Sequence, residues 1–214
     1  MKQHYFLLLF TFLLSCSIQA QDLIITGVYD GPLSGGTPKA IELYVLNDIS
    51  DLSIYGVGSA NNGGGTDGVE LSLEGSAAAG DFIYIASEQP NFNMFFGFDP
   101  DYVNGAAGIN GDDAVDLFMN DAVIDTFGDI NVDGNGEAWE YLDGWASRVN
   151  ETGQDGSTFV IANWSFSGPN ENDDDNMATQ ATATNAWPIA TYEAATTTLP
   201  TITFTEEETQ LTEN

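Results

Sequence analysis

The sequence predicts an all-β fold, an antiparallel sandwich or barrel, and three observations support this class. Short apolar runs recur between clusters of Gly, Asn, Asp and Ser, as expected for strands joined by turns. Several runs alternate apolar and polar residues; Ile41–Val45 places its Ile, Leu and Val on one face and its Glu and Tyr on the other. No stretch shows the 3.6-residue apolar period of a long helix.

Seven runs are the clearest strand candidates, and the last two of them form a predicted hairpin. The turn of this hairpin is Asn120-Asp121, because Asn and Asp readily adopt the backbone conformations of tight two-residue turns. Ser157–Ile161 and Ile202–Thr205 are weaker candidates. The seven runs are Leu23–Val28, Ala40–Leu46, Leu52–Val57, Gly68–Leu73, Asp81–Ala86, Ala114–Met119 and Ala122–Phe127.

Two segments interrupt the strand pattern. Asn61–Asp67 is rich in Gly and Asn and is expected to be a loop. Asn91–Phe98 is crowded with Phe, and the sequence leaves open whether it forms one helical turn or an aromatic plug.

The first twenty residues have the features of a secretory signal peptide. A basic start is followed by the apolar run Tyr5–Leu14 and then by small residues, with cleavage expected after Ala20. The run is shorter than the about 20 residues that a membrane-spanning helix needs. A second interpretation is that Cys16 is the lipid anchor of a lipoprotein. Both interpretations predict a secreted or cell-surface protein without a membrane span.

The ionisable residues exclude most catalytic chemistry. Beyond residue 20 the chain has no His and no Cys, and its only bases are Lys39 and Arg148, so histidine bases, cysteine nucleophiles and His/Cys metal sites are excluded. The formal charge of the full chain is −30, and removing Lys2 with the signal peptide leaves −31. This charge repels phosphate backbones, so we expect no nucleic-acid partner. Without cysteine, the core rather than disulfides must stabilise the fold.

Five sequence blocks, in order, resemble the bacterial lamin-tail domain. The family pattern is an "IELYN" strand, a "dLsgw" strand, an "aGd-y-via" strand, an "nggD-v-L" strand and a "viD-fG" strand. The match covers roughly Asp22–Tyr192, and the chain departs from the pattern where LYVLND replaces "LYNp". The blocks are AIELYVLNDISDLSIYGVG (Ala40–Gly58), AAAGDFIYIA (Ala77–Ala86), INGDDAVDLF (Ile109–Phe118), AVIDTFGDI (Ala122–Ile130) and WEYLDGWASRVN (Trp139–Asn150).

The resemblance implies an immunoglobulin-like antiparallel β-sandwich in a secreted bacterial protein, with an irregular, aromatic-rich C-terminal extension like that of marine Bacteroidetes versions. It also implies a binding or adhesion-type module, sometimes attached in larger proteins to nucleases or phosphatases. The family has no catalytic residue, so none is assigned. Five residues that align with polar family positions and are expected to be structural are Glu42, Asp112, Asp116, Asp125 and Arg148.

These observations predict four parts. Residues 1–20 are the signal peptide, residues 21–136 the sandwich core, and residues 137–192 the aromatic-rich extension packed on it. Residues 193–214 are a Thr/Glu-rich linker. Their final part, ITFTEEETQLTEN, is also similar to the start of Calx-β repeats, so a further β-domain beginning there is the alternative.

The loop after the Ala122–Phe127 run has the D-x-[DN]-x-[DN]-G-x5-E spacing of calcium-binding loops. Carboxylate, amide and carbonyl oxygens are the ligands that calcium prefers. Its flanks are a strand and an aromatic segment rather than two helices, so a solvated turn is the alternative interpretation. A second acidic cluster, Asn170–Asn176, is expected to be solvated loop. The candidate metal ligands are Asp129, Asn131, Asp133, Asn135 and Glu140.

Four tryptophans crowd the C-terminal third: Trp139, Trp145, Trp164 and Trp187. Exposed indoles beside carboxylates would suit the binding of sugar rings. The alternative is that they pack the core and seal the extension against it, and the usual burial of Trp favours this packing interpretation.

The sequence therefore predicts a non-catalytic extracellular binding or adhesion module whose ligand is a protein or a polysaccharide, with calcium as its candidate cofactor. The alternative is an accessory domain of a longer secreted hydrolase or nuclease whose catalytic part follows residue 214. Carboxylate-only glycoside hydrolysis is the one enzymatic chemistry that the composition leaves open.

Overall fold

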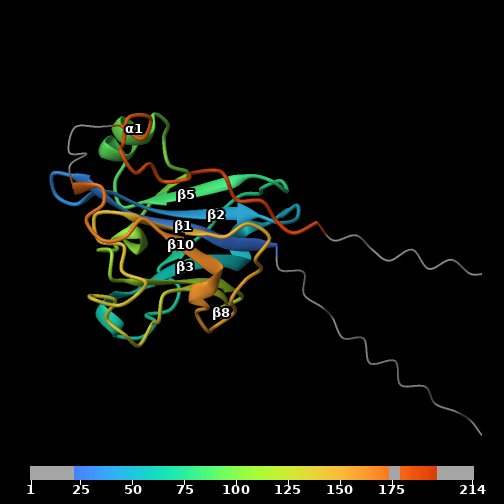
Figure 1. The fold of residues 1–214 in the computed structure, drawn as a ribbon. Helices are drawn as coiled ribbons and strands as arrows, with labels where there is room; N and C mark the ends of the chain where they lie inside the picture. Colours follow the sequence, from blue (N-terminus) through green and yellow to red (C-terminus); the bar gives the residue numbers. More distant parts are fainter. Residues whose placement is uncertain (1–21, 174–178, 197–214) are drawn as a thin grey trace, which may run out of the picture.

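The computed structural model describes residues 22–173 and 179–196, which form an all-β sandwich of two sheets (Figure 1). Neighbouring strands are antiparallel, except that β5 and β6 are parallel. The six-stranded sheet has the order β10 (Trp164–Phe166), β9 (Trp145–Arg148), β1 (Leu23–Leu33), β2 (Thr37–Val45), β5 (Phe82–Ala86), β6 (Tyr102–Val103). The four-stranded sheet has the order β4 (Leu71–Ser72), β3 (Tyr55–Ala60), β7 (Ala114–Met119), β8 (Ala122–Phe127).

The all-β antiparallel prediction is confirmed, while the immunoglobulin-like type stays a prediction. The signal peptide, Cys16 and the candidate strand Ile202–Thr205 lie outside the described residues. Among the residues that are described, no helix is long and apolar enough to cross a membrane.

The hairpin of β7 and β8 has the bounds that the sequence predicts. Its turn residues Asn120 and Asp121 have φ angles of 50° and 63°. Two consecutive positive φ angles are the signature of a type I′ turn, whose twist matches that of the flanking strands.

Other predicted elements are confirmed with changed bounds. The run at Leu52–Val57 begins with the 3-10 turn η1 (Leu52–Ile54), because the Asp51 side chain caps that turn by accepting a hydrogen bond from the Ser53 N–H. Most of Asn91–Phe98 belongs to a helix, α1 (Pro90–Phe96), which ends at Gly97 with a φ of 85°. Two further short 3-10 turns are η2 (Asn61–Gly63) and η3 (Gly105–Ala107).

The predicted strand at Ser157–Ile161 is wrong. The chain there is irregular and enters the 3-10 turn η4 (Ile161–Asn163), and β10 follows it. The Val160 N–H donates to Asp155 Oδ2 (3.0 Å) instead of to a neighbouring strand. Segment 137–192 therefore does more than pack on the sandwich: it supplies β9 and β10 to the six-stranded sheet.

Apolar clusters cover both faces of the six-stranded sheet. The main core lies between the two sheets. A second cluster lies on the outer side, where α1 and the C-terminal segment run (Figure 1), and there Trp187 stacks on Tyr29 with 5.3 Å between ring centroids. All eleven residues of β1 are therefore buried, which explains why its sequence lacks the simple alternation of a half-exposed strand.

A buried ion pair joins the two sheets along one side. Arg148 on β9 donates from Nη2 to both carboxylate oxygens of Asp125 on β8, at 2.9 and 2.8 Å, and neither side chain is exposed. Arg148 Nε donates to the carbonyl of Ile25 (2.5 Å), and its guanidinium lies 4.4 Å from the ring centroid of Trp164. A second carboxylate, that of Asp155, accepts from Arg148 Nη1 at 3.3 Å. One side chain thus links β1, β8, β9 and β10.

We expect Arg148→Met to lower the free energy of unfolding by about 3–5 kcal/mol, because it leaves two carboxylates buried without their cation. Urea denaturation followed by tryptophan fluorescence measures this loss. Arg148→Lys is the matched control: it keeps the charge but loses the two-pronged geometry, so its loss should be smaller. A loss below about 1 kcal/mol for Arg148→Met, within the range of exposed ion pairs, would contradict the assigned role.

Candidate functional site

The predicted calcium loop is largely closed by its own hydrogen bonds. Asp129 Oδ1 accepts from the backbone N–H of Asn131, and Asp133 Oδ1 accepts from that of Asn135, both at 3.0 Å. Glu140 Oε2 accepts from the Gly136 N–H at 2.9 Å. Four of the five candidate ligands are exposed and Glu140 is partly so.

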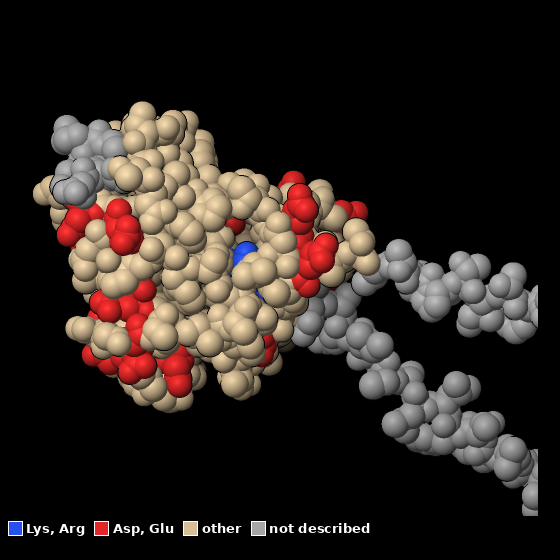
Figure 2. Space-filling view, in the orientation of Figure 1, with Lys and Arg blue, Asp and Glu red and all other residues tan. Residues whose placement is uncertain are grey.

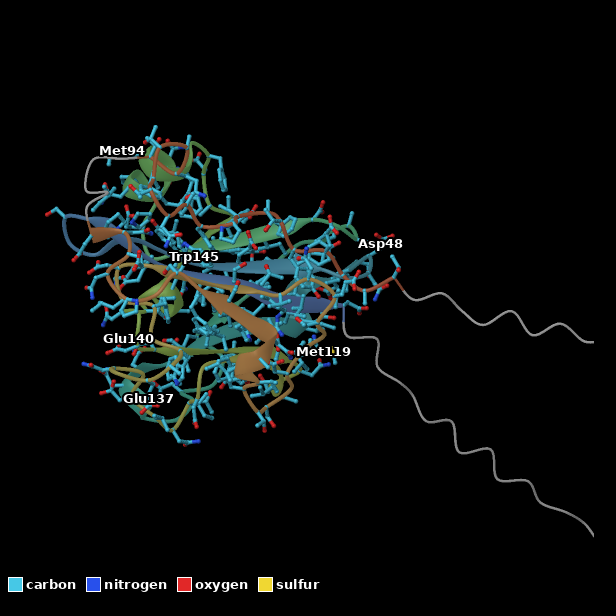
Figure 3. The ribbon with its side chains drawn as sticks, viewed as in Figure 1. Asp48, Met94, Met119, Glu137, Glu140 and Trp145 are labelled. Carbon is cyan, nitrogen blue, oxygen red and sulfur yellow. The ribbon has the colours of Figure 1, made fainter. Side chains whose placement is uncertain are left out.

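The loop side chains do not gather three carboxylates around one point. Within the described residues, no group of three or more His, Cys, Asp or Glu side chains has the arrangement of a metal site. Gly134 has a packing role here, since a Cβ at this position would lie 2.6 Å from the Trp139 ring. Figure 3 shows Glu137 and Glu140 at one end of the sandwich, far from Asp48. In the same orientation, Figure 2 shows acidic side chains gathered mainly at the two ends of the molecule.

Glu42 is a buried carboxylate with a structural role. On the outer side of β2, Oε1 accepts from Thr26 Oγ1 (2.7 Å), and Oε2 accepts from the Tyr84 hydroxyl (2.9 Å) and the Ala190 N–H (2.8 Å). Burial raises the pKa of Glu42, and these three hydrogen bonds oppose that rise. The carboxyl therefore fastens the C-terminal segment to the sheet.

The five residues aligned with polar family positions differ in burial. Glu42, Asp116, Asp125 and Arg148 are all at most 3% exposed and make hydrogen bonds within the fold, as expected for structural groups. Asp112 is only partly buried, and its Oδ1 has no hydrogen-bond partner in the described residues.

The tryptophans pack rather than form a binding face, so the packing interpretation is confirmed. Trp139, Trp164 and Trp187 are each at most 5% exposed. Trp145 is partly buried, and its Nε1 donates to the carbonyl of Asn185 at 3.0 Å.

A groove of about 470 Å³ lies on the side of the sandwich opposite to Arg148, between the end of β4 and the strands β5 and β6. The Tyr102 hydroxyl crosses between the two sheets, donating to the Glu74 carbonyl (2.8 Å) and accepting from the Glu74 N–H (3.1 Å). The groove is lined by Leu52, Glu74–Ala77, Asp81–Ile83 and Asp101–Tyr102.

The groove combines aromatic surface with positioned carboxylates. Tyr102 is partly exposed, and Glu74, Asp81 and Asp101 are exposed. The Phe82 ring packs on Tyr44 in the outer cluster, so Tyr102 supplies the aromatic surface of the groove. The Tyr84 N–H donates to Asp101 Oδ2 and the Ala78 N–H to Asp81 Oδ2, both at 2.8 Å, so backbone amides hold these two carboxyls in place. In the described part of the chain the Oδ1 atom of each accepts no further bond, which leaves it available to a ligand.

No local sequence pattern predicts this groove. Its residues come from four segments, and the parallel pairing of β5 with β6 and the Tyr102–Glu74 contact bring three of them together. Neither contact follows from a local pattern, because β4 and β6 are two-residue strands.

Burial raises the pKa of six carboxyls: Asp30, Glu42, Asp112, Asp116, Asp125 and Asp143, with Asp125 and Asp143 reaching about 6. These groups bind protons more tightly in the folded than in the unfolded chain, where the pKa is about 4. Between pH 4 and 6 the native state therefore holds more protons, and stability falls as pH rises.

We expect the melting temperature to fall by at least about 4 °C between pH 4.5 and pH 7.5, which corresponds to about 1–2 kcal/mol for a domain of this size. Thermal melts in high salt measure it, because salt screens the general repulsion of the acidic surface. Glu42→Gln removes one of the responsible groups and should flatten the curve, whereas the exposed Asp67→Asn should not. A melting temperature that rises across this range would contradict the assignment.

Comparison of the chain with models of protein families, with curated proteins and with solved structures finds no match in any of the three. The lamin-tail resemblance therefore stays a prediction that rests on the five sequence blocks.

Proposed function

We propose that this chain is a non-catalytic binding module of a secreted or cell-surface protein, and that its ligand binds in the groove beside β5 and β6. The observation that carries the proposal is the combination of a partly exposed ring, Tyr102, with carboxylates held by backbone amides. Such a surface is concave, partly apolar and provided with a few oriented polar groups, as small-ligand sites are.

The chemistry of the groove favours an uncharged polysaccharide. Sugar hydroxyls donate hydrogen bonds to carboxylates, and the apolar faces of sugar rings stack on aromatic side chains. Hydrogen bonds to charged acceptors are among the stronger ones in proteins. An anionic polymer would meet Glu74, Asp81 and Asp101 as like charges.

The non-catalytic part of the proposal rests on the residue inventory. Both bases beyond residue 20 are held in ion pairs, Lys39 with Asp30 and Arg148 with Asp125. The buried carboxylates Glu42 and Asp125 each accept several hydrogen bonds from the fold itself. Their contacts account for these groups as parts of the structure.

We also propose that calcium binds the Asp129–Glu140 loop when it is available, and stabilises the end of the sandwich opposite to the Asp48 end. The support is the complete ligand spacing and the exposure of its oxygens. Binding would require the local hydrogen bonds of Asp129, Asp133 and Glu140 to rearrange.

Asp81→Asn and Asp101→Asn should each weaken binding of a neutral polysaccharide by about tenfold, because an ionised acceptor is lost while the amide oxygen still caps the backbone. NMR titration with neutral and sulfated oligosaccharides gives the affinities and maps the contacts. Asp67→Asn, an exposed change outside the groove, is the matched control and should leave affinity unchanged. Binding that maps elsewhere, or no response to any neutral oligosaccharide, would contradict the groove assignment.

Calcium added after chelator treatment should raise the melting temperature, with a stabilisation of about 2.7 kcal/mol at a hundred times the dissociation constant. Asp133→Ala should abolish the shift, and Asp121→Asn, an exposed acidic position outside the loop, should preserve it. Titration calorimetry provides the second readout. The absence of both heat and shift would end the calcium proposal and leave the groove proposal intact.

A further inference from the structure

Lys39 and Asp30 form an unusually enclosed pair. They face each other directly in the antiparallel register of β2 and β1, and Lys39 Nζ lies 2.5 Å from Asp30 Oδ1. The side chain of Lys39 is 13% exposed and that of Asp30 is 3% exposed. Lys39 is also the only lysine beyond residue 20.

Both reacting atoms are fixed by loops at this end of the sandwich. Lys39 Nζ also donates to the carbonyl of Ile109 at 2.7 Å. The backbone N–H of Asp143 donates to Asp30 Oδ2 at 3.3 Å, and a Cβ on Gly111 would lie 3.0 Å from the same oxygen. The amine and the carboxyl therefore have little freedom to separate.

The distance is suited to reaction as well as to ion pairing. A nitrogen 2.5 Å from a carboxylate oxygen lies within about 3.5 Å of the carboxyl carbon, the range of near-attack conformers. Rotation of the carboxyl about its Cβ–Cγ bond turns the face of Cγ toward Nζ. The Asp143 N–H at Oδ2 is positioned to stabilise the negative charge of a tetrahedral intermediate.

Burial favours the neutral form of the Asp30 carboxyl. It raises the pKa of the Asp30 carboxyl against the opposing effect of Lys39. A buried ion pair loses hydration on both partners, so transfer of a proton from the ammonium to the carboxylate relieves two desolvated charges. The products of that transfer are a free amine and a carboxylic acid, the two reactants of amide formation.

We propose that Lys39 and Asp30 condense to an intramolecular amide that covalently joins β1 and β2. The Lys39 Nζ–Asp30 Cγ bond forms, one Cγ–O bond breaks, and the leaving hydroxyl departs with a proton as water. The protons come from the original ammonium, and the nearby Asp143 carboxyl can carry one, since burial and then Asp30 raise its pKa to about 6. Atoms and charge balance without an oxidant or a co-reactant.

The amide would serve this chain as a disulfide serves other secreted domains. The single Cys of the sequence is Cys16, so the described residues contain no disulfide. A cross-link between the paired strands limits the conformations of the unfolded chain, which is how closing a loop stabilises a fold. This inference is independent of the proposed ligand groove and goes beyond it.

Intact mass spectrometry of the denatured chain beginning at Gln21 tests the proposal. We expect wild-type protein to be lighter than its sequence by one water molecule. The matched control Lys39→Arg keeps the ion pair but cannot form this amide, and should show no such loss. Cyclisation of Gln21 would remove ammonia from both proteins and so cancels in the comparison.

Peptide mapping supplies the second readout on the wild-type protein, so no variant needs to fold. The cross-link should yield one branched peptide containing both residues, and a lysine-specific protease should not cut after Lys39. Three results would overturn the proposal: a wild-type chain of full mass, cleavage after Lys39 by the lysine-specific protease, and, in a separate sample, acetylation of Lys39 under denaturing conditions.

Discussion

The buried Arg148–Asp125 pair is the interaction on which the sandwich depends, because it fixes the separation of the two sheets along one side. The same guanidinium holds the carbonyl of Ile25 and lies over Trp164, so one side chain sets the mutual position of four strands. On the opposite side a single tyrosine, Tyr102, performs the corresponding task through backbone bonds. The unequal closure explains why the groove lies there: a guanidinium that lies over the Trp164 ring fills its side, whereas one hydroxyl leaves space beside it.

Carboxylates replace much of what other folds achieve with basic side chains and disulfides. Asp125 accepts the Ile25 N–H, and Asp113 accepts two loop amides, those of Asn62 and Asn110, at 2.8 Å each. Glu42 does the same for Ala190. Each of these bonds joins segments that are separate in the sequence or closes a loop that would otherwise leave a buried N–H without a partner. Part of the acidic excess is therefore architectural, and the rest is surface charge.

Sequence patterns could predict those elements whose pairing is local. β7 and β8 were predictable because an Asn-Asp turn fixes their register. β9 was not predictable, since four residues ending in a buried arginine show no periodicity and their partner β1 lies far along the chain.

The ligand spacing of Asp129–Glu140 is visible in the sequence, but spacing does not determine where the side-chain oxygens point. In the structure three of the loop carboxylates accept hydrogen bonds from backbone amides of the same loop. No local pattern predicted that the C-terminal segment would cover the outer face of the six-stranded sheet. Gly27 makes this covering possible, because a Cβ at position 27 would lie 2.5 Å from the ring of Trp187.

The disposition of the two bases limits how the proposed binding module could recognise a ligand. Because Lys39 and Arg148 are largely enclosed in ion pairs, carboxylates dominate the charge on the surface of the described residues, and Figure 2 shows little basic surface on this face. In physiological salt such charges act over only about 8 Å, so they neither steer a neutral ligand nor attract it from a distance. Recognition by the proposed binding module would then rest on short-range contacts, namely stacking and directed hydrogen bonds. In the function proposed above, Tyr102 and the amide-held carboxylates of the groove would supply these contacts to a ligand with many hydroxyls and no charge.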